Sequence, residues 1–254
     1  MERLKRILVK VGTSAIKNGS GIDQELVNDY ARQIAWLRRN YGIETIIVSS
    51  GAIASGRVLE PNLTRSIIDK QVAAMFGQPE LMTAWRRAFQ RQDMIAGEAL
   101  LKDDDLENFR YPLLRALQFG VVVINGNDVT YNQDAEEEII SADNDRLSRV
   151  VANRCGVGLL IMLTEAEGIL DEDRKVISNI ASYSDLHRIS FFERTQEGIG
   201  GPGSKLLEAR KFITDATKIA YIAGARMENV ILRIATGERV GTRVTLPLQG
   251  FLNI

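Results

Sequence analysis

The chain has 254 residues, 45% of them hydrophobic, with 32 lysine and arginine residues against 33 aspartate and glutamate residues. This length and apolar content allow one large domain with a full core. The balanced charge argues against nucleic acid as the main partner, because proteins that grip nucleic acid usually carry a basic excess. With a single cysteine, Cys155, and a single histidine, His187, the chain favours neither a zinc site nor serine–histidine hydrolysis. We predict that His187 lies on the surface.

The first residues predict a cytoplasmic protein. They have a charged start and only a short apolar stretch, without the long apolar region and cleavage site of a signal peptide. The longest strongly apolar run, 157–163, is too short to cross a bilayer. The lone cysteine also fits a reducing compartment. We therefore expect no membrane partner.

Apolar runs alternate with amphipathic segments along the chain. Strands are predicted at 6–11, 45–48, 121–124, 157–163 and 230–234. A helix is predicted from a cap at Asp23 to about Asn40, with Gly42 as its stop, and a second helix at about 205–223. Near-continuous apolar strands between helices are typical of a mainly parallel sheet covered on both faces. The predicted fold class is therefore α/β, a three-layer αβα sandwich.

Small or polar residues follow every one of the predicted strands, at the ends where ligands bind in such sheets. Lys10 lies inside the first strand, just before a Gly12-Thr13-Ser14 turn. It is either a lysine at the strand edge or a partner for an anion. Residues 49–56 place small side chains before a predicted helix, where open backbone amides favour a carboxylate or phosphate. Close packing of helices explains these glycines and alanines almost as well.

Two tracts of amides and carboxylates lie further along the chain. They are Asn125-Gly126-Asn127-Asp128 and Asp143-Asn144-Asp145, and each is either a ligand-holding cluster or a simple turn. A glycine-rich loop, 198–203, then leads to Lys205 and the second predicted helix. The loop lacks the spacing of a P-loop, but its open backbone beside a lysine suits a phosphate. A surface loop is the alternative.

The combination of these tracts resembles the amino acid kinase family, and within it the members that phosphorylate glutamate. The resemblance spans nearly the whole chain, in order. It rests on Val-Lys-x-Gly-Thr-Ser at 9–14, Ser-Gly-Ala-Ile-Ala-x-Gly at 50–56, Lys-Gln-x-x-Ala-x-x-Gly-Gln at 70–78, Ile-Asn-x-Asn-Asp at 124–128 and Asp-Asn-Asp at 143–145.

The resemblance implies an amino acid kinase fold that transfers phosphate from ATP to the side-chain carboxylate of L-glutamate, giving γ-glutamyl phosphate, the first intermediate toward proline. That carboxylate, with a reference pKa of about 4.3, is already ionised at pH 7 and needs no general base. The single domain, 1–254, would bind the acceptor with roughly 1–155 and the nucleotide with roughly 156–254. Magnesium would be joined mainly to the phosphates, without a protein metal site. A homodimer or tetramer is expected, and proline is a possible feedback inhibitor.

Residue roles follow from the same resemblance. Lys10 and Lys205 would contact the transferring phosphoryl group, and Asp145 would orient them. The residues that would hold glutamate are Ser50, Gly51, Ala52, Asn125, Asp128 and Asn144. The residues that would contact the nucleotide are Gly12, Thr13, Thr164, Glu165, Gly198, Gly200 and Gly201.

The chain departs from the family pattern at four positions. The family usually has glutamate where this chain has Gly126, and aspartate in place of Glu165. Its loop carries threonine and methionine where Ile199 and Pro202 stand. Ile199 lacks a hydroxyl and Pro202 lacks an N–H donor, so two possible nucleotide contacts are lost. Two alternatives stay open: an enzyme of this fold with a different small acceptor, or a weakened regulatory relative. Many bacterial members also carry a C-terminal PUA domain, and the resemblance leads us to expect the form without it.

Overall fold

The computed structural model describes residues 4–19, 21–102, 105, 108–130, 138–189 and 202–245; for 138–143, 183 and 202 it describes the backbone alone. The largest sheet in the described part has eight strands in the order β5-β6-β4-β1-β7-β9-β10-β8. Their bounds are β1 Arg6–Val11, β4 Glu44–Ser49, β5 Ile95–Leu101, β6 Gly120–Gly126, β7 Leu159–Thr164, β8 Asn179–Ile180, β9 Ile219–Gly224 and β10 Thr242–Val244. The first six strands in this order, β5, β6, β4, β1, β7 and β9, run parallel to one another. Strand β10 is antiparallel to β9, and β8 is parallel to β10. The α/β class with a mainly parallel sheet is confirmed.

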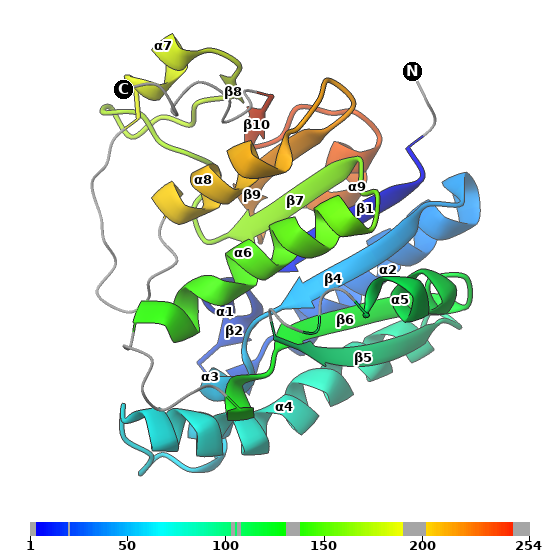
Figure 1. Cartoon of the computed structure of the whole chain (residues 1–254), viewed down its shortest axis with the longest axis vertical. Coiled ribbons are helices and arrows are strands. Elements are labelled where there is room, and N and C mark those ends of the chain that lie inside the picture. The colour runs from blue at the N-terminus through cyan, green and yellow to red at the C-terminus, as the bar shows by residue number, and fades with distance from the viewer. Residues whose placement is uncertain are drawn as a thin grey trace.

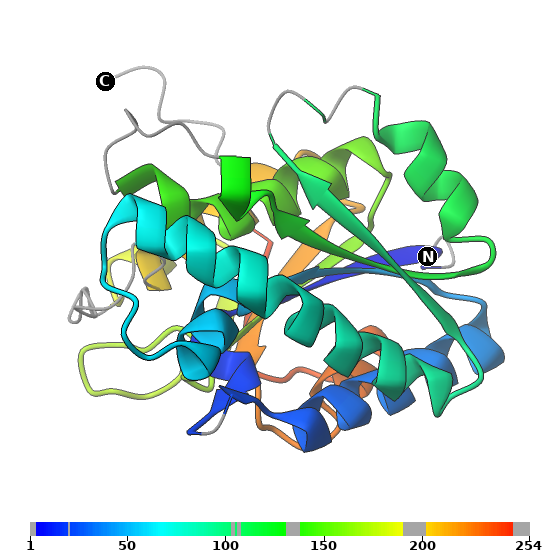
Figure 2. The same cartoon turned by 90° about the horizontal axis from the view of Figure 1, so that it is seen from below.

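Helices cover both faces of this sheet (Figure 1, Figure 2). On one face lie α1 Thr13–Ile16, α2 Gln24–Tyr41, α3 Ala52–Leu59, α4 Ile67–Gln90 and α9 Val230–Ala235; on the other lie α5 Arg110–Ala116, α6 Glu138–Arg154 and α8 Pro202–Phe212. The remaining short elements are β2 Lys17–Asn18, β3 Gly21–Ile22, the 3-10 turn η2 Asp128–Thr130 and α7 Tyr183–Leu186. The three-layer arrangement follows from these two separate cores.

Strand β1 lies at the centre of the sheet, and its residues alternate between the two cores. Ile7, Val9 and Val11 pack with α2 and α4, while Leu8 packs on the opposite face. Lys10 shares the parity of Leu8, so it points toward the face covered by α6 and α8. This alternation places one lysine beside two helices that lie far away in the sequence.

Helix α2 matches its prediction at both ends. Asp23 Oδ1 accepts from the backbone N–H of Leu26 at 3.1 Å, and Gly42 ends the helix in the left-handed region with φ of 68°. An aspartate cap and a glycine stop are common helix boundaries. Tyr30, Ile34 and Leu37 lie fully buried on its inner face.

Two predictions for the C-terminal region are wrong. The expected helix at 205–223 ends at Phe212, and the last residues of that range belong to strand β9, which begins at Ile219. The expected strand at 230–234 is helix α9.

Strand β5, at the sheet edge, was not predicted, because its glycine, alanines and glutamate are poor strand formers.

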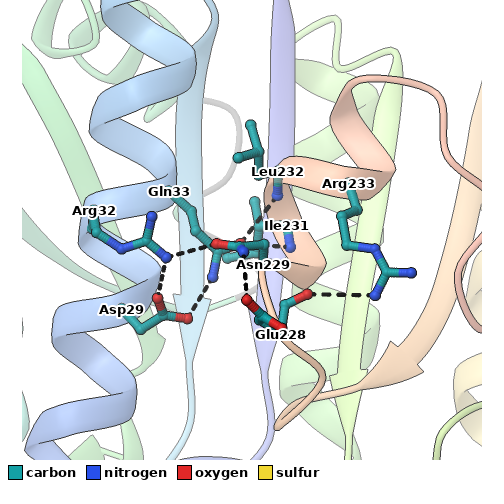
Figure 3. A network of polar contacts seen from close by, with 8 residues as sticks. All are labelled: Asp29, Arg32, Gln33, Glu228, Asn229, Ile231, Leu232 and Arg233. Atoms are coloured by element: carbon teal, nitrogen blue, oxygen red, sulfur yellow. Dashed lines mark hydrogen bonds and ion pairs between the residues drawn. The ribbon is translucent and has the colours of Figure 1, made fainter.

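Helix α9 is capped by a residue of another helix. The side-chain oxygen of Gln33, in α2, accepts from the backbone N–H groups of Ile231 at 2.8 Å and Leu232 at 3.0 Å (Figure 3). Asp29 holds the other end of this amide by accepting from Gln33 Nε2 at 2.6 Å. A six-residue apolar run fits a strand or a helix by composition. The distant cap from Gln33 helps to explain why the helix forms here.

Helices α3 and α4 cross at very short range. A Cβ added to Gly56 would lie 1.8 Å from the carbonyl oxygen of Ala73, and one added to Gly77 would lie 1.8 Å from that of Ala52. Neither position can hold a larger residue without moving a helix. The packing explanation for small residues in 49–56 is therefore correct for Gly56.

The single histidine, His187, is exposed at the end of α7, as predicted. Among the helices that the structure describes, none combines the length and apolar content needed to cross a bilayer.

Candidate active site

Three charged side chains from different elements meet in the interior near the carboxyl end of β1. Asp145, in α6, lies with Oδ1 2.6 Å from Lys10 Nζ and with Oδ2 3.3 Å from Lys205 Nζ. Lys10 comes from β1 and Lys205 from the first turn of α8. The three residues are only 5%, 3% and 7% exposed for Lys10, Asp145 and Lys205. One carboxylate thus holds two ammonium groups side by side.

The electrostatics of this trio favour an anion. Burial on its own would raise the pKa of Asp145, but the positive charges of Lys10 and Lys205 outweigh burial and lower that pKa below its ordinary value. Burial and the charge of Lys10 lower the pKa of Lys205. Two ammonium groups held by one carboxylate present more positive than negative charge within the trio, which suits an anionic ligand. A phosphoryl group is such an anion.

A second, uncharged network lies beside the trio. The side-chain nitrogen of Asn144, the residue before Asp145, donates to Ser50 Oγ at 2.9 Å and to Asn125 Oδ1 at 3.0 Å. The backbone N–H of Gly126 donates to Asn125 Oδ1 at 2.9 Å and to Asn144 Oδ1 at 3.3 Å. Ser50 follows β4, and Asn125 lies near the end of β6. Two neighbouring strand ends and α6 therefore bring these three polar side chains together.

The turn after β4 presents further predicted residues. Gly51 has φ of 124°, a conformation that favours glycine, and it forms the N-cap of α3, which begins at Ala52. Asp128 begins η2, two residues beyond the end of β6, and is half-buried. All the residues predicted to hold glutamate thus lie at or just beyond the ends of β4 and β6 or on α6.

The predicted nucleotide residues lie at the ends of β1 and β7. A Cβ added to Gly12 would lie 3.5 Å from Lys10 Nζ and 3.6 Å from the carbonyl oxygen of Leu163, so this turn lies against the charged trio. Thr13 begins α1, and Thr164 ends β7, followed by the exposed Glu165. The predicted contacts Gly198, Gly200 and Gly201, together with Ile199, lie outside the described residues.

The sequence analysis missed two residues, one amide and one carboxylate, that extend this second network outward. Gln78 Oε1, in α4, accepts from Asn125 Nδ2 at 2.8 Å, and Gln78 Nε2 donates to Glu98 Oε1 at 2.5 Å. Gln78 stands in one of the matched motifs, so its position carried a signal. Glu98 lies on β5, the strand that was not predicted, and no pattern singled it out.

Comparison with known proteins identifies the family. The model of the amino acid kinase family matches residues 5–223. The chain belongs to the amino acid kinase family. This match covers every described element from β1 to most of β9, and with it all three residues of the charged trio.

Curated relatives within the family share a single name. Proteins named glutamate 5-kinase from Nitrosomonas eutropha, Dehalococcoides mccartyi and Caldanaerobacter subterraneus subsp. tengcongensis are 35%, 36% and 36% identical to this family member. The alignments cover 95%, 94% and 96% of this chain and 68% of each relative. The family predicted from the motifs is confirmed, and the relatives' name agrees with the predicted glutamate-phosphorylating branch.

Proposed function

We propose that this kinase transfers the γ-phosphoryl group of ATP to the side-chain carboxylate of L-glutamate, forming γ-glutamyl phosphate and ADP in the first step of proline biosynthesis. The observation that carries the proposal is the buried trio of Lys10, Asp145 and Lys205 beside the network of Ser50, Asn125 and Asn144. The name shared by the relatives supports glutamate as the acceptor.

The arrangement suits phosphoryl transfer without a general base. A carboxylate oxygen of glutamate attacks the γ-phosphorus, the bond to the oxygen that bridges the β- and γ-phosphates breaks, and that oxygen leaves on ADP. No proton moves. Lys10 and Lys205 stabilise the charge on the transferring group, and Asp145 fixes their ammonium groups in place; positioning and charge stabilisation are the main contributions in such reactions.

The acceptor would lie at the ends of β4 and β6. Ser50, Asn125, Asp128 and Asn144 would hold its polar groups, and the open amides of the turn at Gly51 and Ala52 would receive a carboxylate. We extend the proposal to a division of the single domain, with residues 1–155 binding glutamate and 156–254 binding ATP. Strand β1, which borders both parts, supplies Lys10 between them.

ATP would approach from the ends of β1 and β7. Gly12 and Thr13 would contact its phosphates, and Thr164, Glu165 and the loop with Gly198, Gly200 and Gly201 would contact the rest of the nucleotide. Among the described residues, no group of three or more histidine, cysteine, aspartate and glutamate side chains could hold a metal ion. Asp145 is already occupied by two lysines. Magnesium would arrive with the ATP phosphates and neutralise part of their charge.

Assembly and regulation are part of the same proposal. Several large apolar side chains on α3 and α4 expose about half of their surface. An interface between subunits would bury them, which supports a homodimer or tetramer. Their exposed fractions are 47% for Val58, 56% for Leu59, 59% for Ile68, 51% for Met75 and 50% for Phe76. Proline would inhibit by competing near Ser50. Light scattering measures the assembly, and a rise in the KM for glutamate with added proline measures the competition.

The deciding experiment is an ATPase assay with hydroxylamine, which traps an acyl phosphate as a hydroxamate. Glutamate-dependent hydroxamate, with none from aspartate or N-acetylglutamate, is the expected result. Hydroxamate from another acceptor would favour the first alternative, an enzyme of this fold with a different substrate. ATP binding without turnover on any acceptor would favour a regulatory relative, for which the departures at Ile199 and Pro202 provide a reason.

A further inference from the structure

Five side chains form a continuous chain of hydrogen bonds that ends at Ser50. Starting from the sheet edge, Glu98 accepts from Gln78, Gln78 accepts from Asn125, Asn125 accepts from Asn144, and Asn144 donates to Ser50. Its links are 2.5, 2.8, 3.0 and 2.9 Å long. The first member comes from β5, which lies on the opposite side of β6 from β4 and β1, and the second comes from α4.

The chain has a fixed direction, because its ends are chemically one-sided. A carboxylate has only acceptor oxygens, so the amide nitrogen of Gln78 faces Glu98 and its amide oxygen faces Asn125. At the inner end, the backbone N–H of Gly126 can only donate, and it requires the oxygens of Asn125 and Asn144 to face it. Both ends therefore select the same orientation of the three amide groups.

This direction determines what Ser50 offers to a ligand. A hydroxyl has one hydrogen to donate and two lone pairs that accept. Because Ser50 Oγ accepts from Asn144 Nδ2, its own hydrogen stays available for a carboxylate. If the three amides were reversed, the oxygen of Asn144 would take that hydrogen, and Ser50 would present lone pairs to a negatively charged acceptor.

We propose that Glu98 and Gln78 are positioning residues that orient Asn125, Asn144 and Ser50 so that Ser50 donates its hydroxyl hydrogen to a carboxylate of the acceptor. The inference rests on the proposed function, because it assumes that the acceptor is bound near Ser50. Neither residue touches the acceptor. They act through the direction of the chain, and Glu98 is exposed enough to be exchanged without disturbing the core.

The test compares two substitutions of Glu98 in the hydroxamate assay at saturating ATP. Glu98→Gln keeps an oxygen that can accept from Gln78, and we expect its KM for glutamate to stay within about twofold of the wild type. Glu98→Lys can only donate, so it opposes the existing direction. We expect it to raise the KM for glutamate about 5- to 20-fold, while kcat and the KM for ATP change less than about twofold. The effect is limited because Gly126 still favours the original orientation.

Glu80→Lys is the matched control for the change of charge. Glu80 is an exposed glutamate on α4, the helix that carries Gln78. Among the described contacts, no hydrogen bond links it to the series of side chains from Glu98 to Ser50. Its kinetics should equal those of the wild type. Thermal unfolding should give the same Tm for all variants, since Glu98 and Glu80 are both exposed. A second variant, Gln78→Met, breaks the link with a side chain of similar size and should raise the KM for glutamate as Glu98→Lys does.

The possible outcomes separate this inference from the proposed function. A wild-type enzyme that phosphorylates glutamate, with Glu98→Lys and Gln78→Met unchanged, overturns the positioning role alone. Equal losses in Glu98→Gln and Glu98→Lys also overturn it, because the effect would then follow charge and not hydrogen-bond direction. A wild type that forms no hydroxamate from glutamate overturns both proposals. A KM for glutamate that stays near the wild-type value in Glu98→Gln and rises in Glu98→Lys supports the proposed direction.

Discussion

Asn144 and Asp145 are consecutive residues of α6, but their side chains enter different networks. Asn144 donates to Ser50 and Asn125, while Asp145 pairs with Lys10 and Lys205. One peptide bond therefore joins the group proposed to hold the acceptor to the group proposed to hold the phosphoryl-binding lysines. A small rotation of α6 would move both networks together, so the relative position of acceptor and phosphate depends on this helix.

Lys205→Ala should lower kcat by at least about 100-fold, because it removes a positive charge aimed at the transferring phosphoryl group. Lys211→Ala is the control: Lys211 lies on the same helix, is more exposed, and pairs with Glu208 at 3.0 Å. Its kcat should change less than about twofold. Steady-state kinetics on folded protein measure both. Full turnover in Lys205→Ala would contradict the assigned phosphate contact.

Asp145→Asn should both impair turnover and destabilise the fold. The carboxylate separates two buried ammonium groups, and its loss leaves their repulsion uncompensated, so we expect a loss of about 3–5 kcal/mol in the free energy of unfolding. Glu238→Gln, at an exposed ion pair with Arg233, should leave the free energy of unfolding almost unchanged. Urea denaturation measures both.

The pH dependence of this stability has a definite sign. The folded-state pKa of Asp145 is lowered from 3.8, because the two lysines outweigh the opposing effect of burial. Its contribution is therefore fully present above pH 3.8 and is lost as the pH falls from there toward the lowered value. The stability gap between the wild type and Asp145→Asn should narrow in that acidic window. A constant gap would contradict the ion-pair explanation.

The pKa of Lys205 predicts an alkaline limb in the activity. Burial, together with the charge of Lys10, lowers this pKa from its ordinary value of 10.5. As the pH rises through the lowered value, Lys205 loses the charge that attracts the phosphoryl group. We expect kcat/KM for ATP, which reports the free enzyme, to fall at a pH below 10.5. Lys205→Arg should move this limb upward, because a guanidinium stays protonated. An unmoved limb would assign it to another group.

Gly77→Ala should destabilise the crossing of α3 and α4. Its methyl group would lie 1.8 Å from the carbonyl oxygen of Ala52, so one helix must move, at a cost of about 1–3 kcal/mol. Because Ala52 begins α3, the KM for glutamate should rise as well. Gly203→Ala is the matched control on α8: among the described residues, no atom outside its two neighbours and the helix's own backbone lies within 4 Å of an added Cβ, so the variant should be at least as stable as the wild type. Thermal unfolding distinguishes the two.

Gln33→Leu should destabilise the region around α9. Gln33 is fully buried, and its loss leaves the backbone N–H groups of Ile231 and Leu232 without their acceptor, at a cost of about 1–3 kcal/mol. Arg32→Ala alters the same network at an exposed position (Figure 3) and should cost less than about 0.5 kcal/mol. Hydrogen exchange of the two amides reports the loss directly. Unchanged protection would contradict the cap.

The sequence was informative where local chemistry determines structure. The cap at Asp23, the stop at Gly42 and the apolar run of β1 each depend on neighbouring residues, and each was predicted. Helix α9 was not, because part of what favours it is the cap from Gln33, almost two hundred positions away in the chain. Strand β5 was missed since its pairing with β6, rather than its composition, makes it extended.

The candidate site divides in a similar way. The motifs indicated Lys10, Asp145 and Lys205, and the structure places these three side chains in contact. Glu98 could not be found from the sequence. Its place in the network depends on strand β5, whose residues have weak strand propensity, and on helix α4, which brings Gln78 next to Glu98. It also depends on the fixed direction of three amide groups. Each of these is a tertiary property.

The glycine crossing has a consequence for motion. The two backbones meet directly at Gly56 and Gly77, so sliding α3 along α4 would bring larger neighbouring side chains against the facing backbone. We therefore expect the short helix of eight residues and the long one of 24 to move together. The turn at Ser50 and Gly51 is attached to the end of that pair. Any closing movement over a bound acceptor must then carry α4 with it, or come from the opposite wall formed by α6.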